Sequence, residues 1–85
     1  MVKTAVVILN WNGREFLSRF LPEVVKNTVS ADNEVIVADN GSDDDSVAWM
    51  AEHHPEIRVI RLEKNFGYAG GYNRALRQIE AEFFI

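Results

Sequence analysis

The sequence contains no cysteine, and this absence excludes several kinds of chemistry. Without thiols the chain cannot form a disulfide framework, an iron–sulfur cluster, a thiolate zinc site or a cysteine nucleophile. Long apolar runs are lacking too, because residues 5–9 form as long an uninterrupted run as any in the chain, whereas a membrane-spanning helix needs about 20 residues. We therefore expect a soluble chain that is compatible with a reducing compartment.

A surplus of basic residues is also lacking. Nine Lys and Arg stand against 13 Asp and Glu, which gives a net charge of −4 at pH 7. This balance provides no electrostatic attraction for nucleic acid or for an anionic membrane, so neither is expected as a partner. Glycine and proline are few and 47% of the residues are hydrophobic, as in a globular chain. A chain of 85 residues has room for one small core.

Three short apolar segments, rich in Val and Ile and flanked by polar turn residues, are predicted to be strands. They cover residues 5–9, 35–38 and 57–62. The first two are apolar at every position, which indicates strands covered on both faces. The third is interrupted by Arg58 and Arg61 and is therefore expected nearer an edge of the sheet.

Segments of helical periodicity lie between these strands, at residues 16–25, 47–51 and 68–80. Pro22 stands inside the first of them and predicts a kink or a restart near Leu21. Residues 82–85 begin a fourth apolar run. This β-α-β-α-β-α-β alternation predicts the α/β class, a mostly parallel sheet with helices on both faces.

The loops that follow the three strands predict where a ligand binds. In sheets of this class, ligands bind beyond the carboxyl ends of the strands. The loops at residues 10–13, 39–43 and 65–71 are dense in Asn, Asp, Ser and Gly, and all five glycines of the chain fall in them. The position of the glycines therefore favours this edge of the sheet, rather than the opposite edge, as the ligand-binding edge.

Asp39 directly follows a fully apolar strand, where a carboxylate commonly accepts hydrogen bonds from a ribose. Asp, Asn, Gly and Ser are also the residues of ordinary turns, so a turn with a helix N-cap is the alternative. No G-x-G-x-x-G follows the first strand, and no G-x-x-x-x-G-K-[ST] occurs anywhere. These absences disfavour NAD binding and the hydrolysis of ATP or GTP.

The glycine-rich segment 65–73 has two interpretations. Gly70 and Gly71 each cost about 1 kcal/mol relative to Ala inside a helix, so a close backbone approach explains them better than helix propensity does. That approach is either to a phosphate at the helix N-terminus or to the sheet. The acidic run 43–45 is explained by a helix dipole rather than by a metal, and His53 and His54 are expected at the surface.

Taken together, the three loops resemble the successive signatures of the inverting family 2 nucleotide-sugar glycosyltransferases of GT-A fold, especially the rhamnosyltransferase-like members. The matching segments are V-V-I-L-N-W-N-G at 6–13, V-A-D-N-G-S-D-D at 37–44 and N-F-G-Y-A-G-G-Y-N at 65–73. The resemblance covers essentially the whole chain. It implies the Rossmann-like front half of that fold, with strand order 3-2-1-4 and the strand reversal between strands one and four.

The resemblance also implies the residues of a donor site. The first loop and the aspartate ending the second strand would hold the base and ribose of a nucleotide-sugar, and the glycine-rich segment would close over it. The residues implied are Asn10, Asn12, Asp39, Ser42, Asn65, Gly67, Gly70 and Asn73. Tyr72 stands where many relatives carry a basic residue, so no charge contact to the diphosphate is implied there.

The activity implied is that of a parent enzyme transferring a sugar from a UDP- or dTDP-sugar, with inversion, to a glycan or lipid-linked acceptor. The resemblance also implies a role in polysaccharide or cell-wall biosynthesis. The enzyme would lie in the cytoplasm, either free or peripheral at the inner face of the membrane. A divalent cation, Mg or Mn, is expected for the full-length enzyme. In the family the metal motif and the catalytic base follow the fourth strand, so no catalytic residue or metal ligand is assigned within residues 1–85.

Residues 1–85 are therefore expected to be the nucleotide-sugar-binding N-terminal portion of one domain, truncated within the fourth strand and inactive alone. An exposed fourth strand would favour self-association. The alternative from another class is a non-catalytic α/β module that binds a nucleotide or a protein. A nucleotidyltransferase is disfavoured, because the loop after the first strand is not basic and glycine-rich.

Overall fold

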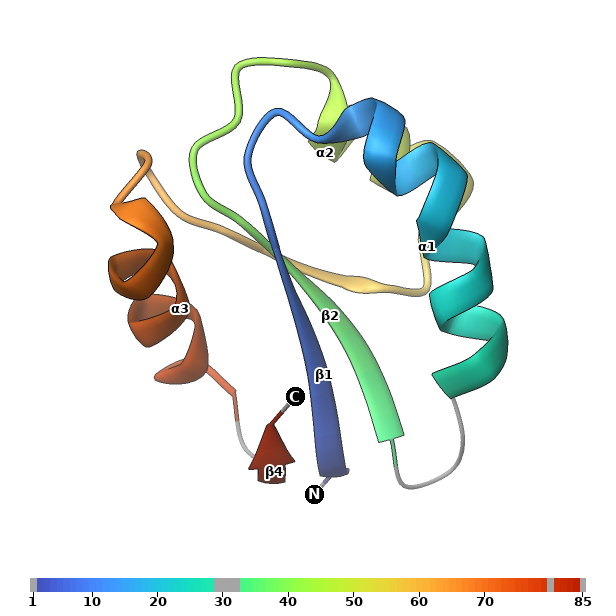
Figure 1. Cartoon of the computed structure of the whole chain (residues 1–85), viewed down its shortest axis with the longest axis vertical. Coiled ribbons are helices and arrows are strands. Elements are labelled where there is room, and N and C mark those ends of the chain that lie inside the picture. The colour runs from blue at the N-terminus through green and yellow to red at the C-terminus, as the bar shows by residue number, and fades with distance from the viewer. Residues whose placement is uncertain (1, 29–32, 80, 85) are drawn as a thin grey trace.

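The computed structural model describes the backbone of residues 2–28, 33–79 and 81–84. Helices and strands alternate along these residues (Figure 1). They are β1 (Val2–Asn10), α1 (Arg14–Thr28), β2 (Asn33–Asp39), α2 (Ser46–His53), β3 (Arg58–Arg61), α3 (Gly67–Leu76) and β4 (Ala81–Phe84). The strands form one parallel sheet in the order β3-β2-β1-β4, which matches the predicted order. The α/β class is confirmed.

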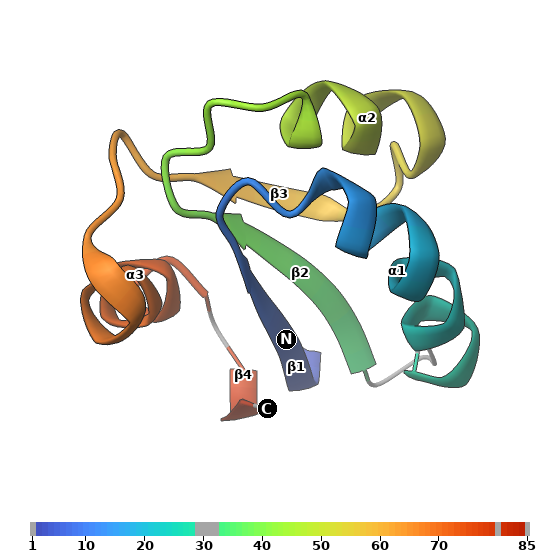
Figure 2. The same cartoon turned by 45° about the horizontal axis from the view of Figure 1, so that its top comes forward.

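Helices cover both faces of the sheet (Figure 2). The core accordingly has two halves, one on each face of the sheet. Ile36 of β2 packs in the cluster that contains Ala75 of α3, whereas Val37 packs with Leu17 of α1 and Met50 of α2. Successive residues of a strand point to opposite faces, so an uninterrupted run of apolar residues is what a strand covered on both sides requires.

α1 is a single helix of 15 residues that contains Pro22, so it does not restart near Leu21, and the alternative of a kink there stays a prediction. Leu17 and Leu21 lie one turn apart and are only 2% and 1% exposed. Both leucines precede the proline, and the partly buried Val24 and Val25 that follow it pack against the same core cluster, so packing stabilises the helix on both sides of Pro22. Pro22 itself lies on the exposed side.

α3 is shorter than the periodicity predicts. It ends at Leu76, after which Gln78 and Ile79 donate hydrogen bonds to carbonyls three residues back, as in a tight turn. Ile79 is 8% exposed and belongs to the same core cluster as Ala75. The apolar spacing therefore continues past the helix because the turn also faces the core. The predicted helix end at Glu80 lies outside the described residues.

β3 lies at one edge of the sheet, as predicted, and its Arg58 and Arg61 side chains are exposed. At the other edge β4 pairs with β1 through Ala5↔Phe84 and two earlier pairs. Self-association through β4 stays a prediction. Within the described residues, no helix combines the length and the apolarity that crossing a membrane requires.

Candidate functional site

The ends of β1, β2 and β3 bring three polar residues into one row. Asn10 pairs in register with Asp39, and Asp39 pairs with Arg61. The ladder extends into the loops, since the Asn40 N–H donates to the Asn10 carbonyl at 2.7 Å and the Leu62 N–H donates to the Asp39 carbonyl at 2.8 Å. The loops that follow the three strands are therefore fixed beside one another at the carboxyl edge of the sheet.

The Asp39 carboxylate is the centre of a buried hydrogen-bond network. It is 2% exposed and accepts from the Asn10 side-chain amide at 2.9 Å, the Ser42 hydroxyl at 2.6 Å and the Ser42 backbone N–H at 3.1 Å. A buried charge is costly unless such donors compensate it. Asp39 thus holds the first loop and the second loop together and leaves Ser42 at the surface side of the network.

Asn12 joins the same two loops from the exposed side. Its φ of 51° places it in the left-handed region, which Asn tolerates better than most residues. Its N–H donates to the Ser42 hydroxyl at 2.9 Å, and its side-chain oxygen accepts from the N–H groups of Asp43 at 2.7 Å and Asp44 at 3.2 Å. Asn10, Asn12, Asp39 and Ser42, which the resemblance assigns together to a donor site, are joined by hydrogen bonds into one unit.

Two carboxylates of the acidic run after Ser42, those of Asp44 and Asp45, are engaged by donors of the same chain. Asp44 accepts from the backbone N–H of Arg14 and from both the N–H and the hydroxyl of Ser46, while Asp45 lies 3.8 Å from the Arg14 guanidinium. Partial burial raises the pKa of Asp44, but the hydrogen bonds from Ser46 and Arg14 together bring that pKa below its ordinary value.

The described residues do not fit the divalent cation that the resemblance implies. Asp44, the carboxylate of the acidic run with the most hydrogen bonds, is already paired with donors within the chain. Across residues 4–27 and 33–79, no group of three His, Cys, Asp or Glu side chains could hold a metal ion. A cation would need ligands from outside this set.

Asn65 and Gly67 begin the glycine-rich segment. The Asn65 side-chain oxygen accepts from the Asn40 amide at 3.1 Å and from the Gly67 N–H at 2.7 Å, so it is engaged within the chain. Gly67 has a φ of 79°, which favours glycine, and a Cβ there would meet open space. These two residues shape the turn that leads into α3.

Gly70 and Asn73 lie on α3 itself. The Arg74 guanidinium donates to the Gly70 carbonyl at 3.3 Å and lies 3.8 Å from the centre of the Phe66 ring. Asn73 is exposed. Tyr72, in the position that is basic in many relatives, donates its hydroxyl to the Val7 carbonyl at 3.2 Å, and burial raises its pKa.

A cavity of about 380 Å³ opens beside Ser42, within the size range of small-molecule sites. Its lining consists of Gly41, Ser42, Asp43, Arg61, Leu62 and Glu63. Of the predicted site residues only Ser42 lines it. Asn10 and Asp39 support Ser42 from the buried side, and the other predicted residues lie outside the lining.

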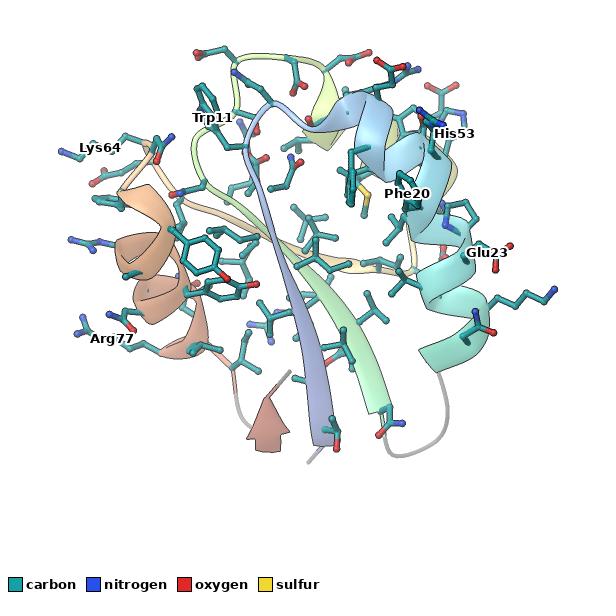
Figure 3. The ribbon with its side chains drawn as sticks, viewed as in Figure 1. Trp11, Phe20, Glu23, His53, Lys64 and Arg77 are labelled. Atoms are coloured by element: carbon teal, nitrogen blue, oxygen red, sulfur yellow. The ribbon has the colours of Figure 1, made fainter. Side chains whose placement is uncertain are left out.

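Sequence reasoning missed the wall that β3 contributes. Arg61 ends β3 as Asp39 ends β2, and the two residues pair in register. The sequence signal for this wall was therefore the polar residues at the end of the third strand, Arg61 and Glu63. Figure 3 shows Trp11 on the first loop and Lys64 on the loop before α3, at the margins of this region. Trp11 is 53% exposed and does not line the cavity.

The open parallel sheet with a ligand-sized cavity at its carboxyl edge has the GT-A fold of glycosyltransferases. The model of glycosyl transferase family 2 matches residues 5–85, and the chain belongs to that family. The family resemblance drawn from the three loops is thereby confirmed.

Two curated relatives align with nearly the whole chain. It is 33% identical over 86 residues to an uncharacterized glycosyltransferase, YfnE, of Bacillus subtilis, covering 99% of this chain and 22% of that protein. It is 30% identical over 89 residues to the teichoic acid poly(glycerol phosphate) polymerase of Staphylococcus epidermidis, covering 100% of this chain and 12% of that protein. The chain therefore spans less than a quarter of the length of either relative.

Two solved structures show the same fold. S. aureus TarS residues 1–349 in complex with UDP superimposes with a TM-score of 0.78 at 27% identity, covering 99% of this chain and 27% of that one. The mannosyltransferase PcManGT of Pyrobaculum calidifontis, in complex with GDP-Man and Mn2+, gives a TM-score of 0.75 at 23% identity, covering 92% of this chain and 24% of that one. The second likeness concerns the fold alone.

Proposed function

We propose that residues 1–85 are the donor-binding N-terminal portion of a longer glycosyltransferase domain. That enzyme transfers a sugar from a UDP- or dTDP-sugar to a glycan or lipid-linked acceptor with inversion of the anomeric centre. The observation that carries the proposal is the cavity at the carboxyl edge of β2 and β3, walled by Ser42, which Asp39 holds in place. The UDP complex of the similarly folded TarS supports a uridine nucleotide.

The lining of the cavity suits a pyrimidine nucleoside diphosphate. Uracil and thymine each present one N–H donor between two carbonyl acceptors. Asp43 and Glu63 offer acceptors on the wall, and Leu62 offers an apolar surface. The Ser42 hydroxyl, which donates to Asp39 and accepts from Asn10 and Asn12, fixes the shape of the wall between them. The Arg61 guanidinium is the charged group of the wall that suits a diphosphate.

The remaining predicted residues complete the proposed site. Asn10, Asn12 and Asp39 keep the nucleoside side in shape through their bonds to Ser42 and its loop. We assign the other side of the donor site to the glycine-rich segment, with the residues Asn65, Gly67, Gly70 and Asn73, which lie outside the lining of the cavity. Catalytic groups and the ligands of a Mg or Mn ion belong, in this proposal, to the rest of the domain.

The wider setting follows from the relatives. One of them is named a teichoic acid polymerase, which supports a role in cell-wall or surface polysaccharide biosynthesis. Sugar nucleotides are cytoplasmic donors, so we place the parent enzyme in the cytoplasm or at the inner face of the membrane.

Nucleotide binding is tested by titrating the isotope-labelled 85-residue chain with UDP and dTDP and recording its amide NMR spectrum, with ATP and NAD as controls. We expect saturable shifts at Ser42, Arg61 and Glu63 with UDP or dTDP alone. Ser42→Ala should weaken binding about tenfold, because it removes the hydroxyl that joins Asn10, Asn12 and Asp39 at the wall of the cavity. The matched control is Ser18→Ala, since the Ser18 hydroxyl bonds only within α1, to the Glu15 carbonyl.

A well-dispersed spectrum that neither UDP nor dTDP perturbs would contradict the donor-site assignment. The transfer reaction is tested separately on the full-length enzyme, by following release of UDP or dTDP from sugar nucleotides. The anomeric configuration of the product is then read by NMR. A product that retains the donor configuration would contradict the inverting reaction.

A further inference from the structure

Asn40 is a buried amide that was not among the predicted site residues. It is 2% exposed and directly follows β2. Its Nδ2 donates to the Asn65 side-chain oxygen and to the Gly67 carbonyl, both at 3.1 Å, and its Oδ1 accepts from the Phe66 N–H at 3.0 Å. One side chain at the end of β2 therefore binds three consecutive residues, 65–67, at the start of α3.

The Asn40 amide also fills the space beside α3. A Cβ at the buried Gly71 would lie 2.8 Å from the Asn40 Nδ2 and 3.0 Å from its Oδ1. Glycine is less favourable than Ala inside a helix, and the close contact with Asn40 explains why glycine occupies position 71. In the same region a Cβ at Gly41 would lie 2.6 Å from the Asn65 backbone nitrogen. The end of β2 and the glycine-rich segment are thus in direct contact.

The start of α3 depends on this contact. Its N-cap residue, Phe66, makes no side-chain capping hydrogen bond, and a phenylalanine side chain has no group to make one. Phe66 is partly buried against the core, whereas Asn65, Gly67 and Tyr68 are exposed, so burial alone does not fix these three residues. The two donors and the acceptor of Asn40 supply the fixed points instead.

We propose that Asn40 is a positioning residue of the donor site. It fixes residues 65–71 against the end of β2, so that the distance between this segment and the loop after β2 stays constant. The effect on nucleotide affinity rests on the proposed function, whereas the effect on the segment does not. An amide is needed at this position because it presents a donor and an acceptor together. A carboxylate of the same shape would turn an oxygen toward the carbonyl of Gly67 and the side-chain oxygen of Asn65.

The positioning role is tested first without nucleotide, by amide hydrogen exchange of the 85-residue chain measured by NMR. In Asn40→Asp we expect exchange at Phe66 and Gly71 to accelerate at least tenfold more than at Val7 and Ile36 in the sheet. The matched control is Asn27→Asp, the same change at an exposed position on α1. Equal acceleration throughout the sheet and α3 would overturn the proposal, as would an unchanged exchange rate at Phe66.

Two further variants keep the test decisive if Asn40→Asp does not fold. Asn65→Ala, at an exposed position, removes one partner of Asn40 and should accelerate exchange at the same amides. Gly71→Ala should do so in the wild-type background but should add no further acceleration to that of Asn40→Ala, which vacates the space that the new Cβ needs. If the accelerations caused by Gly71→Ala and Asn40→Ala add in the double variant, the contact between Asn40 and Gly71 is not the cause of the Gly71→Ala effect.

Nucleotide affinity provides the second readout. If the wild-type chain binds UDP, Asn40→Asp should weaken that binding about tenfold, while Asn27→Asp should not change it. Wild-type affinity in Asn40→Asp would overturn the positioning role and leave the proposed function standing. If the wild-type chain binds neither UDP nor dTDP, the proposed function fails, and the exchange experiment still decides whether Asn40 fixes the segment.

Discussion

The side-chain amide of Asn10 and the carboxylate of Asp39 are 29 positions apart in the sequence and meet at 2.9 Å. They meet because the two residues are direct partners in the register of β1 and β2. A slip of one residue in that register would turn every side chain of one strand to the opposite face and separate the pair. The geometry of the candidate site is therefore set by the same pairing that sets the core.

Replacing Asp39 by Asn tests how much that network stabilises the fold. Asp39→Asn keeps the shape of the side chain but replaces one acceptor oxygen with an N–H₂ group that faces the donors of Asn10 or Ser42. A buried donor left without an acceptor costs about 1 to 3 kcal/mol. We expect the free energy of unfolding, measured by urea denaturation, to fall by that amount.

The control for this change is Asp43→Asn, in the same loop but at an exposed side chain. It alters the net charge equally and should change the free energy of unfolding by less than about 0.5 kcal/mol. Equal losses in the two variants would show that charge, rather than the buried network, accounts for the effect.

The α/β class and the strand order were predictable because each strand carries its own local signal, a run of Val and Ile between polar turns. The lining of the cavity was not, because Arg61 was interpreted only as a sign of an edge strand. Asn40 escaped notice for another reason. Its partners begin 25 residues away, and nothing local separates it from an ordinary turn residue. The persistence of α1 through Pro22 likewise depends on contacts with the sheet.

A matched pair of glycines isolates the close contact between the second loop and the segment before α3. Gly41 and Gly67 have φ angles of 76° and 79°, so an Ala at either position carries a similar conformational cost of about 1 to 2 kcal/mol. A Cβ at Gly41 would also lie 2.6 Å from the Lys64 Cα, whereas a Cβ at Gly67 meets open space. Gly41→Ala should therefore lose a further 1 to 3 kcal/mol or so in urea unfolding. Equal losses would contradict the close contact.

The lowered pKa of Asp44 predicts that the free energy of unfolding decreases at acid pH. Hydrogen bonds from Ser46 and Arg14 outweigh partial burial and hold its pKa in the folded chain below the ordinary 3.8. A carboxylate with a lowered folded pKa stabilises the fold at pH values above the unfolded pKa, and that contribution is lost as the pH falls through the folded pKa.

Asp44→Asn removes this titration. We expect its free energy of unfolding, followed by urea denaturation from about pH 5 down to about pH 2, to vary less with pH than that of the wild type. Asp43→Asn retains Asp44 and should keep the wild-type slope. A slope in Asp44→Asn as steep as in the wild type would assign the acid sensitivity to other groups.

The raised pKa of Tyr72 predicts that the free energy of unfolding decreases at alkaline pH. Burial raises its pKa above 10, so its protonated form stabilises the fold below the unfolded pKa, and this contribution is lost as the pH rises through the folded value. Tyr72→Phe removes both the titration and the 3.2 Å hydrogen bond to the Val7 carbonyl, which costs about 0.5 to 1.5 kcal/mol at neutral pH. Urea unfolding at pH 7 and near pH 11 measures both effects. Tyr68→Phe removes a charge and a hydrogen bond that also raise the Tyr72 pKa, so it should reduce the alkaline decline without abolishing it, because burial is the larger cause. If Tyr72→Phe declines as steeply as the wild type, the burial of the Tyr72 phenol is not the cause.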